Sequence, residues 1–381
     1  MKILKPLAAV AITFISACAP SEQKTADDIL VGEFGSMTGP EATFGVSTHN
    51  GILMAVDEIN ANGGVRGRRI RIISEDDQSK PEEAAVAVQK LISSDQVISV
   101  LGEVASSNSL AAAPICEGSR IPMISPSSTH PSVTKVGDYI FRMCFIDTYQ
   151  GPVMARYLRL DLGIRTVAML TDNRSDYSRG LGDAFAETFE SLDGTIVARQ
   201  SFSKGDADFR PQLTAIKQAN PQVLFIPGYY NDVGQIAIQA RDLGITVPLV
   251  GGDGWESPKL LELGGKALEG CLYSNHYFVD DPAPAVQSFV KSYELRHGAK
   301  PDSLAALGYD SMRVLADAMA RANSFEPSAI RDQIAKTKDF AGVTGQITLG
   351  PDRNPVGKKL VVLEVKNGAL TLKKTIEPRQ Q

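Results

Sequence analysis

The sequence predicts an α/β fold of two lobes, each built on a mainly parallel sheet with helices on both faces. Two observations support this prediction. Apolar strand-like runs alternate with amphipathic helix-like segments, and the alternation restarts after Gln150-Gly151. The chain of 381 residues also exceeds the roughly 250–300 residues at which a single hydrophobic core stops growing. We therefore expect one sheet before about Asp147 and a second sheet after it.

The first half of the chain has the clearest alternation. Its first helix should end at Gly63-Gly64, since glycine weakens a helix. The expected strands are residues 28–34, 68–77, 97–102, 122–125 and 139–145, and the expected helices are residues 45–64, 80–93 and 106–119.

The second half repeats this pattern, and a helical segment precedes or follows each strand-like run. The last part of the chain differs, because it reads as short terminal strands or a hairpin. The expected strands are residues 166–172, 195–202, 222–228 and 247–253, followed by the terminal runs at 345–350 and 358–376.

The N-terminus has the features of an export signal. A basic start precedes an apolar run, Leu7–Ile15, of about half the roughly 20 residues that a spanning helix needs. The segment "ISAC" at its end resembles the lipobox of bacterial lipoproteins, which implies that Cys18 is lipidated. We predict a signal peptide at residues 1–17 and a polar tether at 18–25. An ordinary signal peptide with an incidental cysteine is the alternative.

The mature chain is acidic and contains three cysteines. Removal of the signal peptide leaves 364 of 381 residues and takes Lys2 and Lys5 away, so the formal charge falls from −5 to about −7. Because no basic patch stands out, we expect no nucleic-acid partner. An odd number of cysteines cannot all pair internally. Pairing of Cys116 with Cys144 and buried free thiols, with Cys271 unpaired, both stay open.

Polar residues gather where the predicted strands end. In open parallel sheets, ligands bind outside the carboxyl ends of the strands. One such segment is most simply a helix cap, but five in register across two lobes favour a polar cleft between the lobes. The segments are residues 101–109, 124–131, 170–180, 226–235 and 250–257.

Catalytic and metal-binding patterns are weak or missing. The chain lacks a nucleophile elbow, an H-E-x-x-H motif and a P-loop, and its four histidines have no metal spacing. A Ser127–His130 pair would suit a secreted hydrolase, although the missing elbow argues against that class. We therefore predict a protein that is not an enzyme and has no metal or cofactor.

The chain resembles the substrate-binding proteins of branched-chain amino acid ABC transporters, the Leu/Ile/Val-binding family, which has the type I periplasmic binding fold. The resemblance covers about Ile29 to Thr375. It is carried by the order and spacing of "GSMTGPEATFG", "GILMAVDEINANGGVRGRRI", "EDDQSKPEEAAVAVQKLI", "MISPSSTHPSVT", "YQG", "GYYNDVGQ" and "GGDG".

The resemblance implies that the ligand binds as a zwitterion, with Asp253 paired to its ammonium and Ser106 facing its carboxylate at a helix N-terminus. A charged group removed from water needs such partners. The other residues that the resemblance assigns to the ligand are Ser127, Ser128 and Thr129 at the head group, Tyr177 and Tyr229 from the second lobe, and Phe44 and Leu304 near the side-chain pocket.

This chain departs from the family pattern at two positions. Many members have Glu where this chain has Asp253, and some have an aromatic ring where it has Leu304. The family also includes binders of aromatic acids, amides and other small solutes. We favour an amino acid, branched-chain or otherwise apolar. Another small organic acid or amide, and a receptor that reports to a membrane sensor, stay open.

The family fold implies a hinge of three crossings, near residues 145–150, 274–278 and 350–357, which closes around the solute. It also implies an exported monomer, periplasmic or at the cell surface, held to a bacterial membrane by its lipid anchor. The partners would be an ABC transporter permease and ATPase. The predicted lobes are residues 26–147 with 277–351, and residues 148–276 with 352–381.

Overall fold

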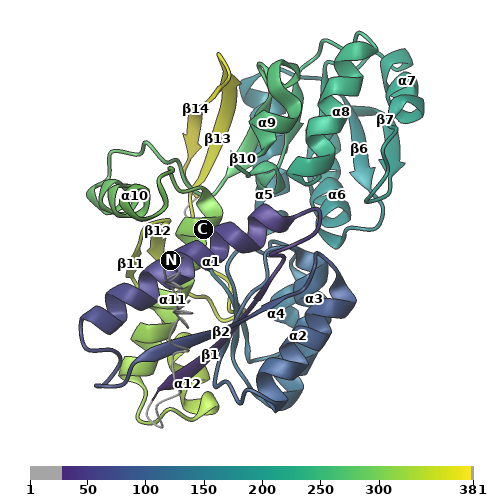
Figure 1. The fold of residues 1–381 in the computed structure, drawn as a ribbon. Coiled ribbons are helices and arrows are strands. Elements are labelled where there is room, and N and C mark those ends of the chain that lie inside the picture. Colours follow the sequence, from purple (N-terminus) through teal and green to yellow (C-terminus); the bar gives the residue numbers. More distant parts are fainter. Residues whose placement is uncertain (1–27, 379–381) are drawn as a thin grey trace, which may run out of the picture.

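A computed structural model describes residues 28–378, which form two lobes, one above the other in Figure 1. Each lobe has its own sheet with helices on both faces, which confirms the predicted α/β fold. The lower lobe in this view contains the purple and blue N-terminal elements, and the upper lobe contains the teal central elements.

The sheet of the first lobe has five parallel strands. Apolar clusters cover both of its faces, one with α1, α10 and α11, and the other with α2 and α3. In order across the sheet, the strands are β2 (Ile70–Asp76), β1 (Ile29–Gly35), β3 (Val100–Leu101), β4 (Met123–Ser125) and β5 (Ile140–Arg142). The lobe also contains α1 (Ala42–Ala61), α2 (Pro81–Ser93), α3 (Ser106–Ser119), α4 (Ser132–Lys135), α10 (Pro284–His297), α11 (Ser303–Arg321), α12 (Pro327–Ile334) and a small antiparallel pair, β11 (Phe340–Gly342) and β12 (Gly345–Ile347).

The sheet of the second lobe has seven strands, of which only the C-terminal hairpin runs antiparallel to its neighbours. In order across the sheet, the strands are β14 (Ala369–Ile376), β13 (Leu360–Lys366), β10 (Leu272–Asn275), β9 (Leu249–Gly251), β8 (Val223–Ile226), β6 (Thr166–Asp172) and β7 (Thr195–Phe202). The helices are α5 (Asp147–Arg156), its continuation η1 (Tyr157–Asp161), α6 (Asp176–Ser191), α7 (Arg210–Gln218), α8 (Tyr230–Asp242), η2 (Asp253–Trp255), α9 (Leu260–Gly264) and η3 (Gly265–Leu268).

Local sequence explains several of these element ends. Helix α1 ends before Gly63-Gly64, where both glycines have positive φ, as predicted. Helix α6 begins with Ser175 accepting the N–H of Ser178, and α11 begins with Asp302 accepting that of Ala305. The run at 97–102 forms only the two-residue strand β3, because the chain turns away at Gly102, which has a φ of 137°.

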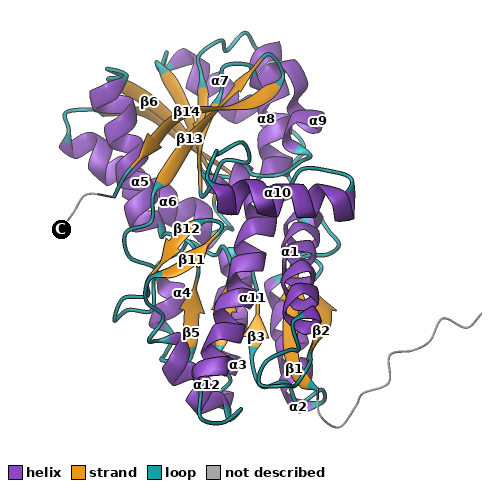
Figure 2. Cartoon of the chain, turned by 90° about the vertical axis from the view of Figure 1, so that its left-hand side faces the viewer, coloured by secondary structure: helices purple, strands orange, loops and turns teal. Residues whose placement is uncertain are grey.

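Helices α1 and α11 lie side by side across the first sheet in Figure 2. A Cβ atom at Gly51 would lie 1.9 Å from the carbonyl oxygen of Ala305, so only glycine permits this close approach. The first turns of both helices point toward the second lobe and supply side chains to the cleft described below.

The chain passes between the lobes in three segments. The first joins β5 to α5, the second joins β10 to α10, and the third joins β12 to β13. The predicted lobe boundaries at 147, 276 and 351 fall at or within these connections. Cys116, Cys144 and Cys271 are all buried free thiols, so the pairing of Cys116 with Cys144 is not formed. No helix within residues 28–378 is long and apolar enough to cross a membrane.

Candidate ligand-binding site

A small cavity lies between the two lobes, at the carboxyl ends of the strands. Its volume is about 10 Å³, enough for roughly one water molecule. The cavity is therefore too small for an organic solute. The first lobe contributes Phe44, Val104, Ser127, Thr129 and Leu304 to its lining, and the second lobe contributes Tyr177, Tyr229, Asp253 and Gly254.

Seven of the nine ligand residues assigned from the sequence line this cavity; the exceptions are Ser106 and Ser128. The Oγ of Ser106 accepts the N–H of His130 at 3.2 Å. The Oγ of Ser128 lies 2.9 Å from the carbonyl oxygen of Glu103, to which it can donate. Both hydroxyls hold backbone around the cavity, and a ligand contact by either residue stays a prediction from the resemblance.

Asp253 is the charged residue of the cavity wall and is held on every side. Its Oδ1 accepts hydrogen bonds from Gln150 Nε2 at 2.9 Å and from Tyr177 Oη at 3.0 Å. Its Oδ2 lies 3.0 Å from Nε2 of His276. Gln150 also accepts the backbone N–H of Asp253 and the hydroxyl of Ser274 through its Oε1. These contacts fix the direction in which the carboxylate faces.

Two neighbours of Asp253 are uncharged at neutral pH. Burial, and then the charge of Asp253, raise the pKa of Asp147 to about 8, so this side chain is protonated near pH 7. Burial likewise raises the pKa of the Tyr177 phenol well above its usual value. The protonated phenol therefore remains a hydrogen-bond donor to Asp253.

The opposite polar wall is the loop after β4. The hydroxyls of Ser127 and Thr129 are buried there and neither makes a hydrogen bond of good geometry, although Thr129 lies against the Asp147 carboxyl. Buried polar groups are rarely left in this state, so a polar group of a ligand would stabilise them. Arg142, which is fully buried, fastens the loop by donating to the carbonyl oxygens of Ser128 and His130. Its guanidinium favours a negative charge in the cavity.

The remaining wall is apolar and aromatic. Phe44, Val104 and Leu304 come from the first lobe. The ring of Tyr229 stacks on Tyr177 with centroids 5.2 Å apart. The same ring meets the edge of Phe44 across the cleft, again at 5.2 Å. The cavity thus combines hydroxyl donors, one carboxylate and an apolar wall, which suits a zwitterion with an apolar side chain.

The hydrolase alternative lacks its nucleophile pair. Ser127 Oγ makes no hydrogen bond to His130, and His130 Nδ1 instead accepts the N–H of Ser132 at 3.3 Å. No group of three or more His, Cys, Asp or Glu side chains in the part of the chain that the structure describes is placed to hold a metal ion.

Sequence reasoning missed several residues that shape the site. Val104 and Gly254 line the cavity, whereas Gln150 and His276 hold Asp253 from behind. Gln150 and Gly254 lie in the segments "YQG" and "GGDG" that carry the resemblance, and Arg142 was visible as a charged residue inside the apolar run 139–145.

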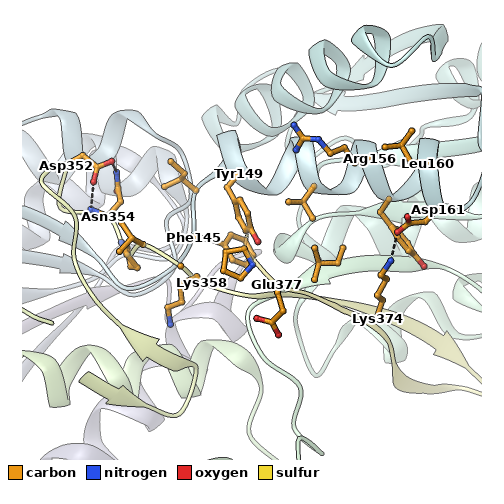
Figure 3. Close-up of a pocket in the computed structure, with 18 residues that line it drawn as sticks. Phe145, Tyr149, Arg156, Leu160, Asp161, Asp352, Asn354, Lys358, Lys374 and Glu377 are labelled. Atoms are coloured by element: carbon orange, nitrogen blue, oxygen red, sulfur yellow. Dashed lines mark hydrogen bonds and ion pairs between the residues drawn. The ribbon is translucent and has the colours of Figure 1, made fainter. Parts of the chain in front are cut away.

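A second cavity, of about 780 Å³, lies at the hinge (Figure 3). Its wall combines α5, η1, the third connection and the end of β14. The rings of Tyr149 and Phe145 lie at its centre, and Asp161 pairs with Lys374 at one end. None of the residues predicted to bind ligand lines it, and no parallel strand ends in it. The smaller cavity is therefore the candidate site for a solute.

Comparisons with known proteins agree with the two-lobed α/β fold. The family model described as "Periplasmic binding protein" matches residues 28–369. The chain is 31% identical to the leucine-specific-binding protein of Salmonella typhimurium over 91% of this chain and 92% of that protein. A leucine-binding protein of Thermotoga maritima is similar in structure, with a TM-score of 0.89 and 38% identity over 92% of this chain and 99% of that one. A branched-chain amino acid transporter substrate-binding protein of Streptococcus pneumoniae, solved with isoleucine, has a TM-score of 0.86 and 33% identity over 92% of this chain and 100% of that one.

Proposed function

Because the chain belongs to the periplasmic binding protein family, we propose that it captures an amino acid with an apolar side chain for an ABC importer. The observation that carries this proposal is the composition of the interlobe cavity. Unpartnered hydroxyls, one carboxylate and an apolar wall meet there from both lobes. Each part corresponds to one part of an apolar amino acid, namely its carboxylate, its ammonium and its side chain.

The ligand carboxylate would lie against the loop after β4. Ser127 and Thr129 supply hydroxyl donors there, and the guanidinium of Arg142 lies beneath the loop. The ammonium would face Asp253, and the side chain would contact Phe44, Val104 and Leu304. This arrangement replaces the water that each charged group loses, which would otherwise cost several kcal/mol per group.

Capture requires the lobes to separate and close again. The cavity has room for roughly one water molecule, so a solute enters only when the walls move apart. Three connections join the lobes and form the hinge. Closure over the solute would present a changed surface to the permease and ATPase of the importer. The solute is released unchanged, as expected of a solute-binding family rather than of an enzyme.

The family operates outside the cytoplasmic membrane, and we propose that this chain is anchored there through lipid on Cys18. This residue lies outside the described residues, so the proposal depends on the lipobox-like segment that ends at Cys18 and on the basic, apolar segment before it.

A thermal-shift screen of amino acids and small organic acids tests the proposed function. A ligand that binds only the native state raises the melting temperature, by an amount that grows with its concentration relative to Kd. Leucine, isoleucine or valine should raise the melting temperature, and calorimetric titration should then give one site per chain. If no amino acid raises it while another class of solute does, the amino-acid assignment is wrong.

A further inference from the structure

We propose that His276 determines specificity by holding one oxygen of Asp253, so that the site also accepts apolar carboxylates that lack an ammonium group. The ligand class would then include 2-oxo acids as well as the corresponding amino acids. This inference rests on the proposed function, because it concerns the same cavity.

The position of His276 leads to this inference. It is the first residue after β10, in the second connection between the lobes, and only 4% of it is exposed. Its Nε2 lies 3.0 Å from Asp253 Oδ2. Its ring packs on that of Phe145, from the first connection, with centroids 3.9 Å apart and planes at 30°. Packing against the hinge thus directs the imidazole at the proposed ammonium partner.

Asp253 is nearly saturated before a ligand binds. A carboxylate offers about four acceptor positions, and Gln150, Tyr177 and His276 use three of them. A ligand ammonium has three N–H donors, so Asp253 can satisfy only one of them without displacing a protein donor. The other two would need the hydroxyl oxygens of Ser127 and Thr129 or backbone carbonyls.

A ligand without an ammonium group, such as a 2-oxo acid, interacts with Asp253 in another way. It has no donor for Asp253, and a bare carboxylate facing it would repel its negative charge. An ionised carboxylate can only accept, so Nε2 of His276 must carry the proton in this 3.0 Å contact, and its hydrogen bond reduces the repulsion. The hydrogen bond from His276 therefore weakens the preference of the site for amino acids. It also reduces the loss of affinity for the corresponding 2-oxo acids.

Two substitutions separate this role from a structural one. His276→Phe keeps a ring against Phe145 but removes the donor, whereas His276→Gln keeps an N–H donor. The measurement is calorimetric titration of each protein with leucine and with 4-methyl-2-oxopentanoate. We expect the ratio of the Kd of the oxo acid to that of leucine to rise about tenfold or more in His276→Phe. In His276→Gln the ratio should stay near the wild-type value.

The outcomes are distinguishable. Equal weakening of both ligands in a folded His276→Phe protein, or an unchanged ratio, overturns the inference. If His276→Phe does not fold, His276→Leu makes the same comparison with a smaller side chain. As a further check, His276→Phe in an Asp253→Asn background should leave the ratio unchanged, because no carboxylate remains to be shared. If the wild type binds neither leucine nor any other amino acid, the proposed function fails, and not only the inference.

Discussion

Asp253 carries a charge in a cavity whose other lining side chains are hydroxylic, aromatic or aliphatic. Asp253→Asn would remove this charge but keep the shape of the side chain and an acceptor for Gln150. Loss of one member of a buried charge pair typically costs about 2–5 kcal/mol, so affinity for an amino acid should fall by a factor of roughly 30 to several thousand. Calorimetric titration measures this loss.

The matching 2-oxo acid is the control for this prediction, because it has no ammonium to lose a partner. Its affinity for Asp253→Asn should change little or improve. If the variant binds its amino acid as tightly as the wild type does, the ammonium partner has been misassigned.

Cys18 is a second single residue with a specific prediction. If it carries lipid, the wild-type protein should sediment with membranes after export, since acyl chains anchor a protein to a bilayer. Cys18→Ser should move the exported protein into the soluble fraction, as fractionation and immunoblotting would show. A wild-type protein that is already soluble after export contradicts the lipoprotein assignment.

At the scale of an element, the start of α5 contains an unusual acid. Asp147 is the first residue of this helix and is fully buried, and its pKa is raised to about 8 from its usual 3.8. The folded protein therefore binds a proton here that the unfolded chain releases above about pH 4. The stability from this proton is present below the unfolded pKa and is lost as pH rises toward 8.

Asp147→Asn should remove this pH dependence, because asparagine keeps an acceptor for Gln150 without ionising. Relative to wild type, the variant should gain stability between pH 4 and pH 8, by at most about 6 kcal/mol. Melting curves of both proteins across this range measure the difference. Burial also raises the pKa of Asp232 and Glu256 to about 7, but these groups are common to both proteins. If the melting temperatures of the two proteins change with pH in the same way, Asp147 is not the source of this pH dependence.

At the scale of the whole molecule, polar contacts cross the cleft and join the two lobes. Lys204 of the second lobe lies 2.7 Å from Glu41 Oε2 and 2.8 Å from the carbonyl oxygen of Ser79, both in the first lobe. Glu41 is fully buried, and burial raises its pKa, although the charge of Lys204 acts against this rise. Ser107 Oγ of the first lobe also donates a hydrogen bond to Asp176 Oδ2 of the second lobe, at 2.9 Å.

Lys204→Met should therefore speed ligand release, because it keeps the length of the side chain but leaves Glu41 without its cation. Since Lys204 is partly exposed, we expect an increase in koff of about tenfold rather than more. Stopped-flow measurement of ligand release gives this rate. Lys259→Met is the matched control, because its pair with Glu262 lies within the second lobe. Equal rates in Lys204→Met and wild type would show that this contact does not hold the lobes closed.

The sequence by itself determined the two α/β lobes and much of the cavity wall. Strand and helix periodicity is local, and the carboxyl ends of parallel strands in one sheet lie at the same edge, so the polar segments that contain Ser127, Thr129, Tyr229 and Asp253 could be placed at that edge of each sheet without coordinates. Gly63 and Gly64 marked the end of a helix for the same local reason. The family resemblance was needed for Phe44 and Leu304, which lie in helices outside these segments.

Only the tertiary structure decided which side chains face one another. Gln150 and Asp253 are 103 positions apart in the chain, and Lys204 and Glu41 are 163 apart. No periodicity links such pairs, since the packing of elements within a lobe, and of one lobe on the other, sets their distances. The same packing turned Ser128 toward backbone carbonyls and directed His276 at Asp253. Side-chain direction within a loop depends on the surrounding atoms. Folding brings these atoms together from distant parts of the chain, so the sequence alone does not show which of them are neighbours.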